Sequence, residues 1–164
     1  MRLRGKIICP VCGKKLNFRI ISRIDFVGEG IILFAFSCKN CGYSGFDIFP
    51  EKIHEPRIIE FKVKEKKDLD VLIARSSTAT IKIPEIGAEI KPGPSAQGFI
   101  TTVEGVLLRF KEVFKGNPKA VKLIDELLEG KPFTLIIDDP FGTSAVDSTE
   151  ANIIVKKRKS FKTP

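Results

Sequence analysis

The hydrophobic pattern divides the chain into strand-like segments and one helical region. Short runs rich in β-branched and aromatic residues, the composition typical of strands, recur along most of the sequence. Two of them lie in the first third, on either side of a turn signal formed by Gly28, Glu29 and Gly30. The pattern therefore predicts a mainly β protein with strands at residues 16–24, 31–37, 57–63, 70–74, 78–83, 133–137 and 151–155.

The first two segments predict a β-hairpin with arms of unequal length. Fifteen residues lie between the first cysteine pair and Gly28, and seven lie between Gly30 and the second cysteine pair. We expect the longer arm to contain an extra bend or strand near Ser22 and Arg23. Further along, Gly and Pro punctuate residues 84–98, so that this stretch is expected to be mostly loop.

Residues 101–130 are expected to form a helical hairpin. Thr101 and Glu104 stand at the spacing of a capping box, with Thr101 as the predicted N-cap of the first helix. Asn117 as N-cap and Pro118 at the first helical position begin the second helix. Each helix carries one apolar face at i, i+3, i+4 spacing, and we expect these faces to pack on a sheet. The faces comprise Val103, Val106, Leu107, Phe110 and Phe114, then Val121, Ile124, Leu127 and Leu128.

All four cysteines belong to two C-x-x-C-G motifs, at residues 9–13 and 38–42. Such a turn can present two thiolates to one point, because glycine tolerates the positive φ that the turn needs. Two turns of this kind complete the closed tetrahedral shell that is typical of structural zinc. A closed shell leaves no position for water or substrate. The sequence therefore predicts zinc as architecture rather than as a catalyst.

Other interpretations of the cysteines are weaker. Disulfides need an oxidising compartment, and the first six residues contain no apolar secretory segment. A thioredoxin-like redox pair needs only one C-x-x-C, at the start of a helix. Another metal or an iron–sulfur cluster is a minor alternative. The one histidine, His54, comes after a shell that is already full, so we expect it to be a surface or strand residue.

Length and composition fit either one ordinary domain or a small metal module beside one compact domain. The chain has 164 residues, of which 43% are hydrophobic, and no apolar run approaches the ~18 residues that a membrane helix needs. We expect a soluble, cytoplasmic protein that does not bind membranes. The predicted division is a zinc ribbon at 1–48 and a β domain at 49–164, with the helical hairpin inserted and a basic C-terminal tail.

A net charge of +8 favours acidic partners, either nucleic acid or an acidic protein surface. Part of the excess lies at residues 156–159, which we expect to be a mobile arm. Single-strand recognition would need exposed aromatic rings among cations, and Phe18, Arg19, Lys39 and Tyr43 could supply them. Most of the 13 phenylalanines lie in strand-like runs, however, where core packing explains them. RNA or DNA binding is thus an alternative function.

Signatures of catalysis are weak. The sequence contains no G-x-x-x-x-G-K-[ST], G-x-G-x-x-G or G-x-S-x-G motif, and one histidine gives little support to an imidazole-based triad. Asp138 and Asp139 follow an apolar segment and precede Pro140. Adjacent residues of a strand point to opposite faces, so a turn role is favoured over partner contact and partner contact over catalysis. We expect a protein that is not an enzyme.

Three further motifs follow the cysteine pairs: I-P-E at residues 83–85, T-T-V-E-G at 101–105 and D-D-P at 138–140. With the cysteine pairs they resemble the ZPR-one zinc-finger family in its short, archaeal-like form, from Cys9 to about Ser144. Family members usually carry a small residue, Gly, Asn and Ser after D-D-P, where this chain has F-G-T-S. The eukaryotic members contain two such modules in tandem, and this chain has one.

The resemblance implies a four-cysteine ribbon beside a domain like a double-stranded β-helix, with a helical hairpin inserted. It also implies a function without catalysis, because the eukaryotic relatives bind translation elongation factor one alpha and are thought to assist its folding. We therefore expect a zinc-binding protein-interaction module, an adaptor or folding factor for that elongation factor. The expected zinc ligands are Cys9, Cys12, Cys38 and Cys41. The family motifs suggest partner contacts at Pro84, Glu85, Thr101, Thr102, Glu104, Asp138 and Asp139.

Overall fold

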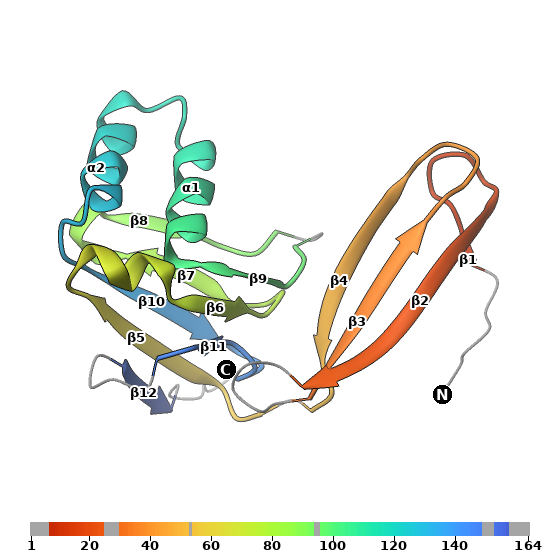
Figure 1. Cartoon of the computed structure of the whole chain (residues 1–164), viewed down its shortest axis with the longest axis horizontal. Coiled ribbons are helices and arrows are strands. Elements are labelled where there is room, and N and C mark those ends of the chain that lie inside the picture. Colours follow the sequence, from red (N-terminus) through yellow and green to blue (C-terminus); the bar gives the residue numbers. More distant parts are fainter. Residues whose placement is uncertain (1–6, 25–29, 53, 94–95, 149–152, 158–164) are drawn as a thin grey trace, which may run out of the picture. The chain divides into compact units, whose positions relative to one another are not determined.

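The chain folds into two compact units, a ribbon unit (Met1–Lys52) and a β unit (Ile53–Pro164). The computed structural model in Figure 1 contains strands in both units and α-helices in the β unit. It is mainly β with one helical hairpin, as the hydrophobic pattern predicts. The structure describes residues 7–24, 30–52, 54–93, 96–148 and 153–157.

The ribbon unit is an antiparallel sheet whose strands follow one another in the order β1-β2-β3-β4. The predicted hairpin is present: β2 and β3 pair without interruption from Asn17 opposite Ser37 to Ile24 opposite Gly30. Gly28 and Glu29 of the predicted turn lie outside the described residues. The strands are β1 (Ile7–Ile8), β2 (Lys15–Ile24), β3 (Gly30–Ser37) and β4 (Ser44–Pro50).

Two expectations for the ribbon unit were wrong. No bend interrupts β2 at Ser22 or Arg23, because these residues pair with Ile32 and Ile31 in the continuous ladder. The first residues of the longer arm, Lys15 and Leu16, instead pair with β1. The strand β4 was not expected at all, and it extends the sheet beyond residue 48 to Pro50.

The β unit contains two antiparallel sheets. One has five strands in the order β12-β5-β10-β7-β8, and the other has three in the order β11-β6-β9. The strands are β5 (Arg57–Val63), β6 (Leu72–Arg75), β7 (Thr80–Ile83), β8 (Ala88–Ile90), β9 (Phe99–Thr102), β10 (Phe133–Asp139), β11 (Ala145–Val146) and β12 (Ile153–Lys157). Short 3₁₀-helices lie at Lys66–Asp70 and Pro84–Ile86.

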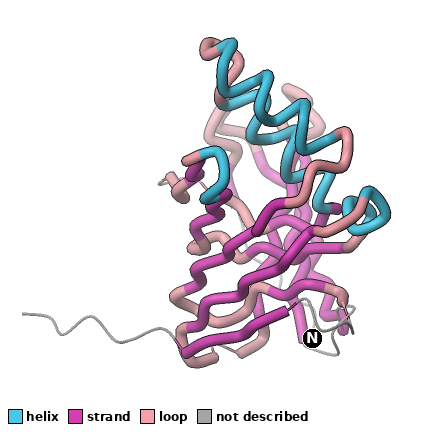
Figure 2. The backbone as a smooth tube through the Cα atoms, turned by 90° about the vertical axis from the view of Figure 1, so that its left-hand side faces the viewer, coloured by secondary structure: helices cyan, strands magenta, loops and turns pink. Residues whose placement is uncertain are grey.

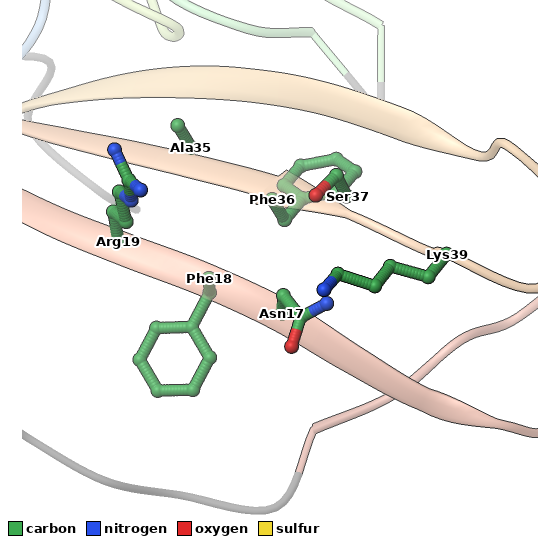
Figure 3. A pocket seen from close by; sticks show the side chains of 7 residues that line it. All are labelled: Asn17, Phe18, Arg19, Ala35, Phe36, Ser37 and Lys39. Carbon is green, nitrogen blue, oxygen red and sulfur yellow. The ribbon is translucent and has the colours of Figure 1, made fainter.

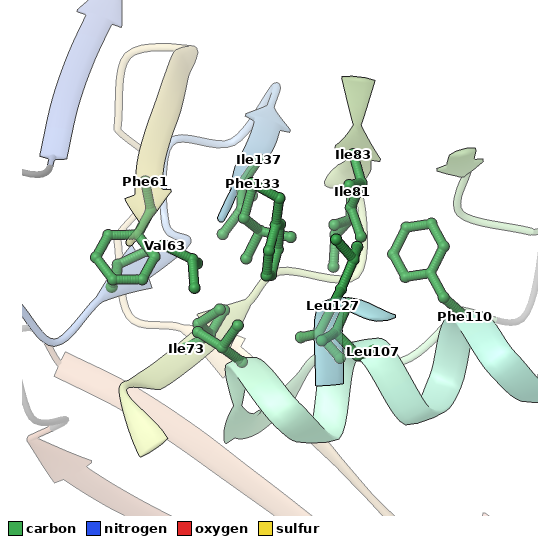
Figure 4. Close-up of a cluster of buried hydrophobic side chains, with 14 of the residues drawn as sticks. Phe61, Val63, Ile73, Ile81, Ile83, Leu107, Phe110, Leu127, Phe133 and Ile137 are labelled. Atoms are coloured by element: carbon green, nitrogen blue, oxygen red, sulfur yellow. The ribbon is translucent and has the colours of Figure 1, made fainter. Parts of the chain in front are cut away.

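A single hydrophobic core holds the β unit together. Alternate residues of β10 are buried, which is the period-2 pattern of a strand with one face on a core. Figure 4 shows side chains from strands and helices meeting in this core, among them Phe61, Ile81, Leu107 and Phe110. At least nineteen of the described residues are buried hydrophobic members of it.

The helical hairpin consists of α1 (Val103–Val113) and α2 (Pro118–Leu128), which lie side by side (Figure 2). Their predicted apolar faces contribute Val106, Leu107, Ile124 and Leu127 to the core, among others. The cap of α2 is as predicted, since the Asn117 side chain accepts a hydrogen bond from the Ala120 N–H at 3.2 Å.

The cap of α1 is one residue later than predicted. Thr102, not Thr101, is the N-cap, and its hydroxyl accepts a hydrogen bond from the Gly105 N–H at 3.1 Å. Glu104 therefore stands one position too early to complete a capping box. A Cβ at Gly105 would collide with the Thr101 hydroxyl, so glycine allows this close approach.

Two other boundaries differ from the sequence expectation. Residues 84–98 contain loop, as expected, and in addition a 3₁₀-helix and β8. Residue 70 ends a 3₁₀-helix, and β6 begins at Leu72. The basic tail is not a free arm throughout, since Lys156 and Lys157 belong to β12 and pair with Ile58 and Arg57. Residues 151, 152, 158 and 159 of these predictions lie outside the described part.

Candidate metal centre

The two cysteine turns share one backbone geometry. In the first, the Cys9 N–H donates to the Lys14 carbonyl at 2.8 Å, and the Gly13 N–H donates to the Cys9 carbonyl at 2.9 Å. The second turn repeats this pattern from Cys38, with distances of 2.7 Å and 3.0 Å. Gly13 and Gly42 have φ of 69° and 76°, the left-handed conformation that explains why glycine follows each pair.

These turns bring the four thiols to one point. The Sγ atoms of Cys9, Cys12, Cys38 and Cys41 all lie within 4.8 Å of one another. The Sγ atoms are 3.6 Å apart between Cys9 and Cys41, and 3.5 Å apart between Cys12 and Cys38. Two sulfurs on one tetrahedral zinc are roughly 3.8 Å apart, given Zn–S bonds of about 2.3 Å. The cluster therefore fits a four-thiolate metal site, and the sulfurs are much too far apart for disulfides.

The protonation of these thiols also points to a cation. A hydrogen bond from the Lys14 backbone lowers the pKa of Cys12 to about 6. A backbone hydrogen bond from Tyr43 acts to lower the pKa of Cys41, but desolvation and the three other thiols outweigh it and raise that pKa to about 12. Four thiolates cannot share one point without a cation to offset their repulsion. A divalent metal would supply that charge.

His54 is not part of the thiol cluster. Its backbone N–H donates to the Phe141 carbonyl at 2.9 Å, within the β unit. His54 is half-buried and lies outside the strands, so the expectation of a surface or strand residue is met only in part.

Residues from the I-P-E and T-T-V-E-G motifs lie partly at the surface. Pro84, Glu85 and Glu104 are exposed, whereas Thr101 and Thr102 are half-buried. The Glu85 carboxylate accepts a hydrogen bond from the Thr134 N–H at 2.8 Å and so ties the 3₁₀-helix to β10. Thr102 caps α1. At least one residue of each motif thus has a structural role within the β unit.

Asp139 organises the turn that follows β10. Its carboxylate is fully buried and accepts hydrogen bonds from the N–H groups of Phe141, Thr143 and Ser144 at 2.6–3.0 Å. The Ser76 hydroxyl donates to the same carboxylate at 2.8 Å. Burial acts to raise the pKa of Asp139, but the hydrogen bonds from Ser144 and Ser76 lower it below the usual value. A buried, fully occupied carboxylate offers no direct contact to a partner, and Asp138 is only half-buried.

The turn after β10 also fixes the chain segment that enters the β unit. Gly142 has φ of 63°, and a Cβ there would collide with the Glu55 carbonyl. The Arg57 guanidinium donates to the Ser144 carbonyl at 2.6 Å. In the ribbon unit, the Glu51 N–H donates to the Gly30 carbonyl at 2.9 Å. The His54 N–H is also bonded to this turn. Two residues therefore separate Glu51, the last anchored residue of the ribbon unit, from His54, the first anchored residue of the β unit.

Sequence reasoning missed the partners of this turn. Ser76 lies 63 residues from Asp139 along the chain, and nothing in the sequence marks it as a neighbour. It also missed Arg75, a buried cation whose guanidinium donates twice to the Ala79 carbonyl, at 3.0 Å and 2.6 Å. Burial lowers the pKa of Arg75, while the charge of Asp139 raises it. The only sequence signal was a charged residue at the end of an apolar run.

None of the helices in the described part of the chain is long and apolar enough to span a membrane.

Comparison with known proteins agrees with the metal centre and the fold. Residues 67–160 match the ZPR1 jelly-roll domain. An uncharacterized ZPR1-like protein of Pyrococcus horikoshii is 40% identical over 92% of this chain and 74% of its own length. A second one, from Methanocaldococcus jannaschii, is 41% identical over 86% of this chain and 79% of its own length.

A eukaryotic relative is longer. The zinc finger chaperone zpr1 of Schizosaccharomyces pombe is 28% identical over 85% of this chain, which spans 34% of that protein. The four-cysteine cluster, the jelly-roll match and the archaeal relatives together identify a zinc-binding module, and this chain belongs to the ZPR1 family.

Proposed function

We propose that this chain is a non-enzymatic adaptor or folding factor that binds the archaeal counterpart of translation elongation factor one alpha. One zinc ion, held by the four cysteines, would keep the ribbon unit folded. Family membership supports the proposal, and the fission yeast relative is named a chaperone. The elongation factor itself is the partner implied by the resemblance of the motifs to this family.

The observation that carries the proposal is that both faces of the ribbon sheet expose large apolar side chains. Phe46 is 57% exposed on one face, and Ile20 and Phe49 are 40% and 44% exposed on the other. Within residues 7–24 and 30–52, no helix or second sheet packs on either face of the β2-β3-β4 sheet. Exposed apolar side chains of this size are typical of surfaces that a partner covers. A folding factor needs such a surface to hold a client that has not yet buried its own.

The candidate chemistry is also compatible with a protein that does not catalyse a reaction. A shell of four cysteines has no open coordination position for substrate. The carboxylate of Asp139 is engaged by hydrogen bonds from its own turn. These features support the proposal that zinc and the paired aspartates are structural.

A refolding assay tests the proposed function. The elongation factor is denatured in urea and diluted into buffer with or without the zinc-loaded chain, and GTP binding is measured as the yield of folded protein. We expect a higher yield with the chain and a complex of the two on size-exclusion chromatography. The control is an equal amount of a protein without folding activity. An unchanged yield together with no complex would refute the proposal.

Nucleic-acid binding is the second candidate, and one observation favours it. Residues 1–52 contain nine Lys and Arg against four Asp and Glu, which is more than half of the net charge in less than a third of the chain. Binding to phosphates releases counterions, so affinity for RNA or DNA should fall steeply with salt. A mobility-shift titration at low and high salt tests this candidate, and no shift at low salt would remove it.

A further inference from the structure

A hollow lies on one face of the ribbon sheet. Strand alternation and register place Arg19, Ala35 and Phe46 side by side on that face, and Asn17, Ser37 and Ser44 in the next row. The central strand β3 carries the small side chains Ala35 and Ser37, so the surface is sunken there. The resulting hollow has a volume of about 510 Å³.

Two cations stand at the ends of this hollow. Figure 3 shows Arg19 at one end and Lys39 at the other, with the Lys39 side chain extended toward Asn17. Neither Arg19 nor Lys39 forms an ion pair within the described residues. Of the described acidic residues in this unit, Asp47 points to the opposite face and Glu51 accepts a hydrogen bond from Ser22. The hollow therefore presents positive charge that the described acidic residues of its own unit do not neutralise.

Apolar side chains border the same hollow. Phe46 stands next to Ala35 across the strands and is 57% exposed. The next row on this face consists of Ile21, Leu33 and Ile48. A ligand lying along β3 would thus contact the two cations where β3 carries its small residues. It would contact apolar side chains immediately beside those positions.

This combination fits an acidic peptide better than a nucleic acid. Nucleic-acid affinity grows with the number of phosphates that cations contact, and single strands also stack bases on aromatic rings. Here only two cations flank the hollow. Phe18 and Phe36 also line the hollow, but strand alternation turns their rings toward the other face, away from Arg19 and Ala35. There they form a cluster with Phe34 and Tyr43, in which neighbouring centroids are 5.5–5.9 Å apart. An extended peptide turns every second side chain toward the sheet, so an acidic and an apolar residue two positions apart match the observed rows.

We propose that this hollow binds a carboxylate side chain of an acidic partner segment between Arg19 and Lys39, with an apolar side chain two residues along that segment on Phe46. The inference rests on the proposed function, because it assumes a protein partner. It adds the chemical class of the segment and the residues that recognise it. Arg19 is suited to a two-pronged hydrogen bond to a carboxylate, and Lys39 to a point-charge contact.

Fluorescence anisotropy with the full, zinc-loaded chain tests the proposal. The probe is a short fluorescein-labelled peptide in which Glu and Phe alternate at every second position with Ser between them, and its matched control has Gln in place of each Glu. The variants Arg19→Gln and Lys39→Gln remove one charge each, and Arg23→Gln and Lys14→Gln remove a charge of the same kind from the same unit outside the hollow. Circular dichroism and zinc content confirm that each variant is folded.

The acidic peptide should bind, and its Gln counterpart should bind at least fivefold more weakly. Arg19→Gln and Lys39→Gln should each weaken binding of the acidic peptide about fivefold, the effect of losing one exposed ion pair. Arg23→Gln and Lys14→Gln should leave it unchanged. Equal binding of both peptides, or equal effects of all four variants, would overturn the proposal.

A single-stranded oligonucleotide of matched length tests whether the hollow binds nucleic acid instead. If it binds more tightly than the peptide and depends on Arg19 and Lys39, the hollow is a phosphate site and the proposal is wrong. The refolding assay separates this failure from failure of the proposed function. If Arg19→Gln and Lys39→Gln still assist refolding fully, the chain acts on its client through another surface.

Discussion

The ribbon unit and the β unit are both built from antiparallel strands, yet they are stabilised in different ways. The β unit buries at least nineteen hydrophobic residues in one core. The corresponding cluster in the described part of the ribbon unit has three buried members, Cys9, Leu16 and Cys38. Two of these are candidate metal ligands. A single sheet without a second layer cannot bury its apolar faces, so a small unit of this kind needs a metal or another cross-link.

The difference has a functional side. In the β unit, the largest apolar side chains form a buried core, although some, such as Leu108, remain exposed. The ribbon unit buries very few and leaves Phe46 and Phe49 on its surface. Stabilisation by a metal allows this, because the ribbon does not have to hide those side chains in order to fold. Apolar side chains therefore form a stable interior in one unit and a partly exposed surface in the other.

The largest effect should come from removing the metal. Structural zinc sites contribute about 10–16 kcal/mol of apparent binding free energy at neutral pH. We therefore expect Cys12→Ser to lose zinc and to unfold the ribbon unit, while the β unit remains folded on its own core. In ¹H–¹⁵N NMR spectra, ribbon resonances should collapse to the unfolded region and those of Phe61 and Leu135 should stay dispersed.

Val11→Ser is the matched control for that variant. Val11 lies in the same turn and is 66% exposed, so its replacement should leave zinc content and both sets of resonances unchanged. Collapse of the β unit in Cys12→Ser would show that the two units fold as one, and the contrast between them would be lost.

The second effect should be confined to the other unit. Phe110 is fully buried in the core of the β unit, and truncating such a residue typically costs about 3–5 kcal/mol. Phe110→Ala should lower the urea midpoint of the β unit without altering zinc content. The matched control is Leu108→Ala, because Leu108 lies two residues before Phe110 on the same helix but is 51% exposed. This variant should change the free energy of unfolding by less than about 0.5 kcal/mol. Equal effects of the two variants would contradict the assigned core.

The third prediction concerns acid stability of the β unit. The pKa of Asp139 is lowered in the folded chain, so its hydrogen bonds stabilise the fold above the unfolded pKa and are lost as pH falls through the folded value. Stability should therefore decrease below about pH 4. Asp139→Asn should cost roughly 2 kcal/mol at neutral pH and flatten this decrease.

Thermal unfolding between neutral and acid pH measures this effect. Asp147→Asn, which changes an exposed carboxylate of the same unit, should keep the wild-type pH profile. If Asp139→Asn also keeps that profile, the buried carboxylate does not produce the acid sensitivity.

The smallest effect should distinguish two neighbouring threonines. Thr102 caps α1 in the structure, and loss of an N-cap typically costs about 1 kcal/mol. Thr102→Ala should therefore lower the free energy of unfolding of the β unit by about that amount, and Thr101→Ala should have a smaller effect. The reverse order in urea denaturation would return the cap to Thr101, where the sequence pattern placed it.

Local features of the fold were predictable from the sequence, and features that depend on distant contacts were not. The cysteine turns and the cap at Asn117 need only neighbouring residues, so their patterns were sufficient. The strand β4 was missed because glycine and proline flank its short alternation of Phe46 and Ile48. It is a strand because β3 provides a complete pairing edge.

The candidate site shows the same division. The ligand cluster follows from two short motifs, and the structure brings all four cysteines together. The setting of Asp139 depends on Ser76, which directly follows β6 and reaches the carboxylate through tertiary packing. The hollow beside Arg19 depends on the register that sets Ala35 opposite it, and hydrophobic patterns do not determine register to one residue.

The short connection between the anchored residues Glu51 and His54 has a consequence for affinity. Its three peptide steps span at most about 11 Å. If a partner binds both units, the second contact forms within the same complex, at an effective concentration in the millimolar range for so short a tether. Each surface can then be weak alone while the pair holds firmly. A client would dissociate stepwise. A change that abolishes either contact would leave the client held by one weak contact, and it would then be released quickly.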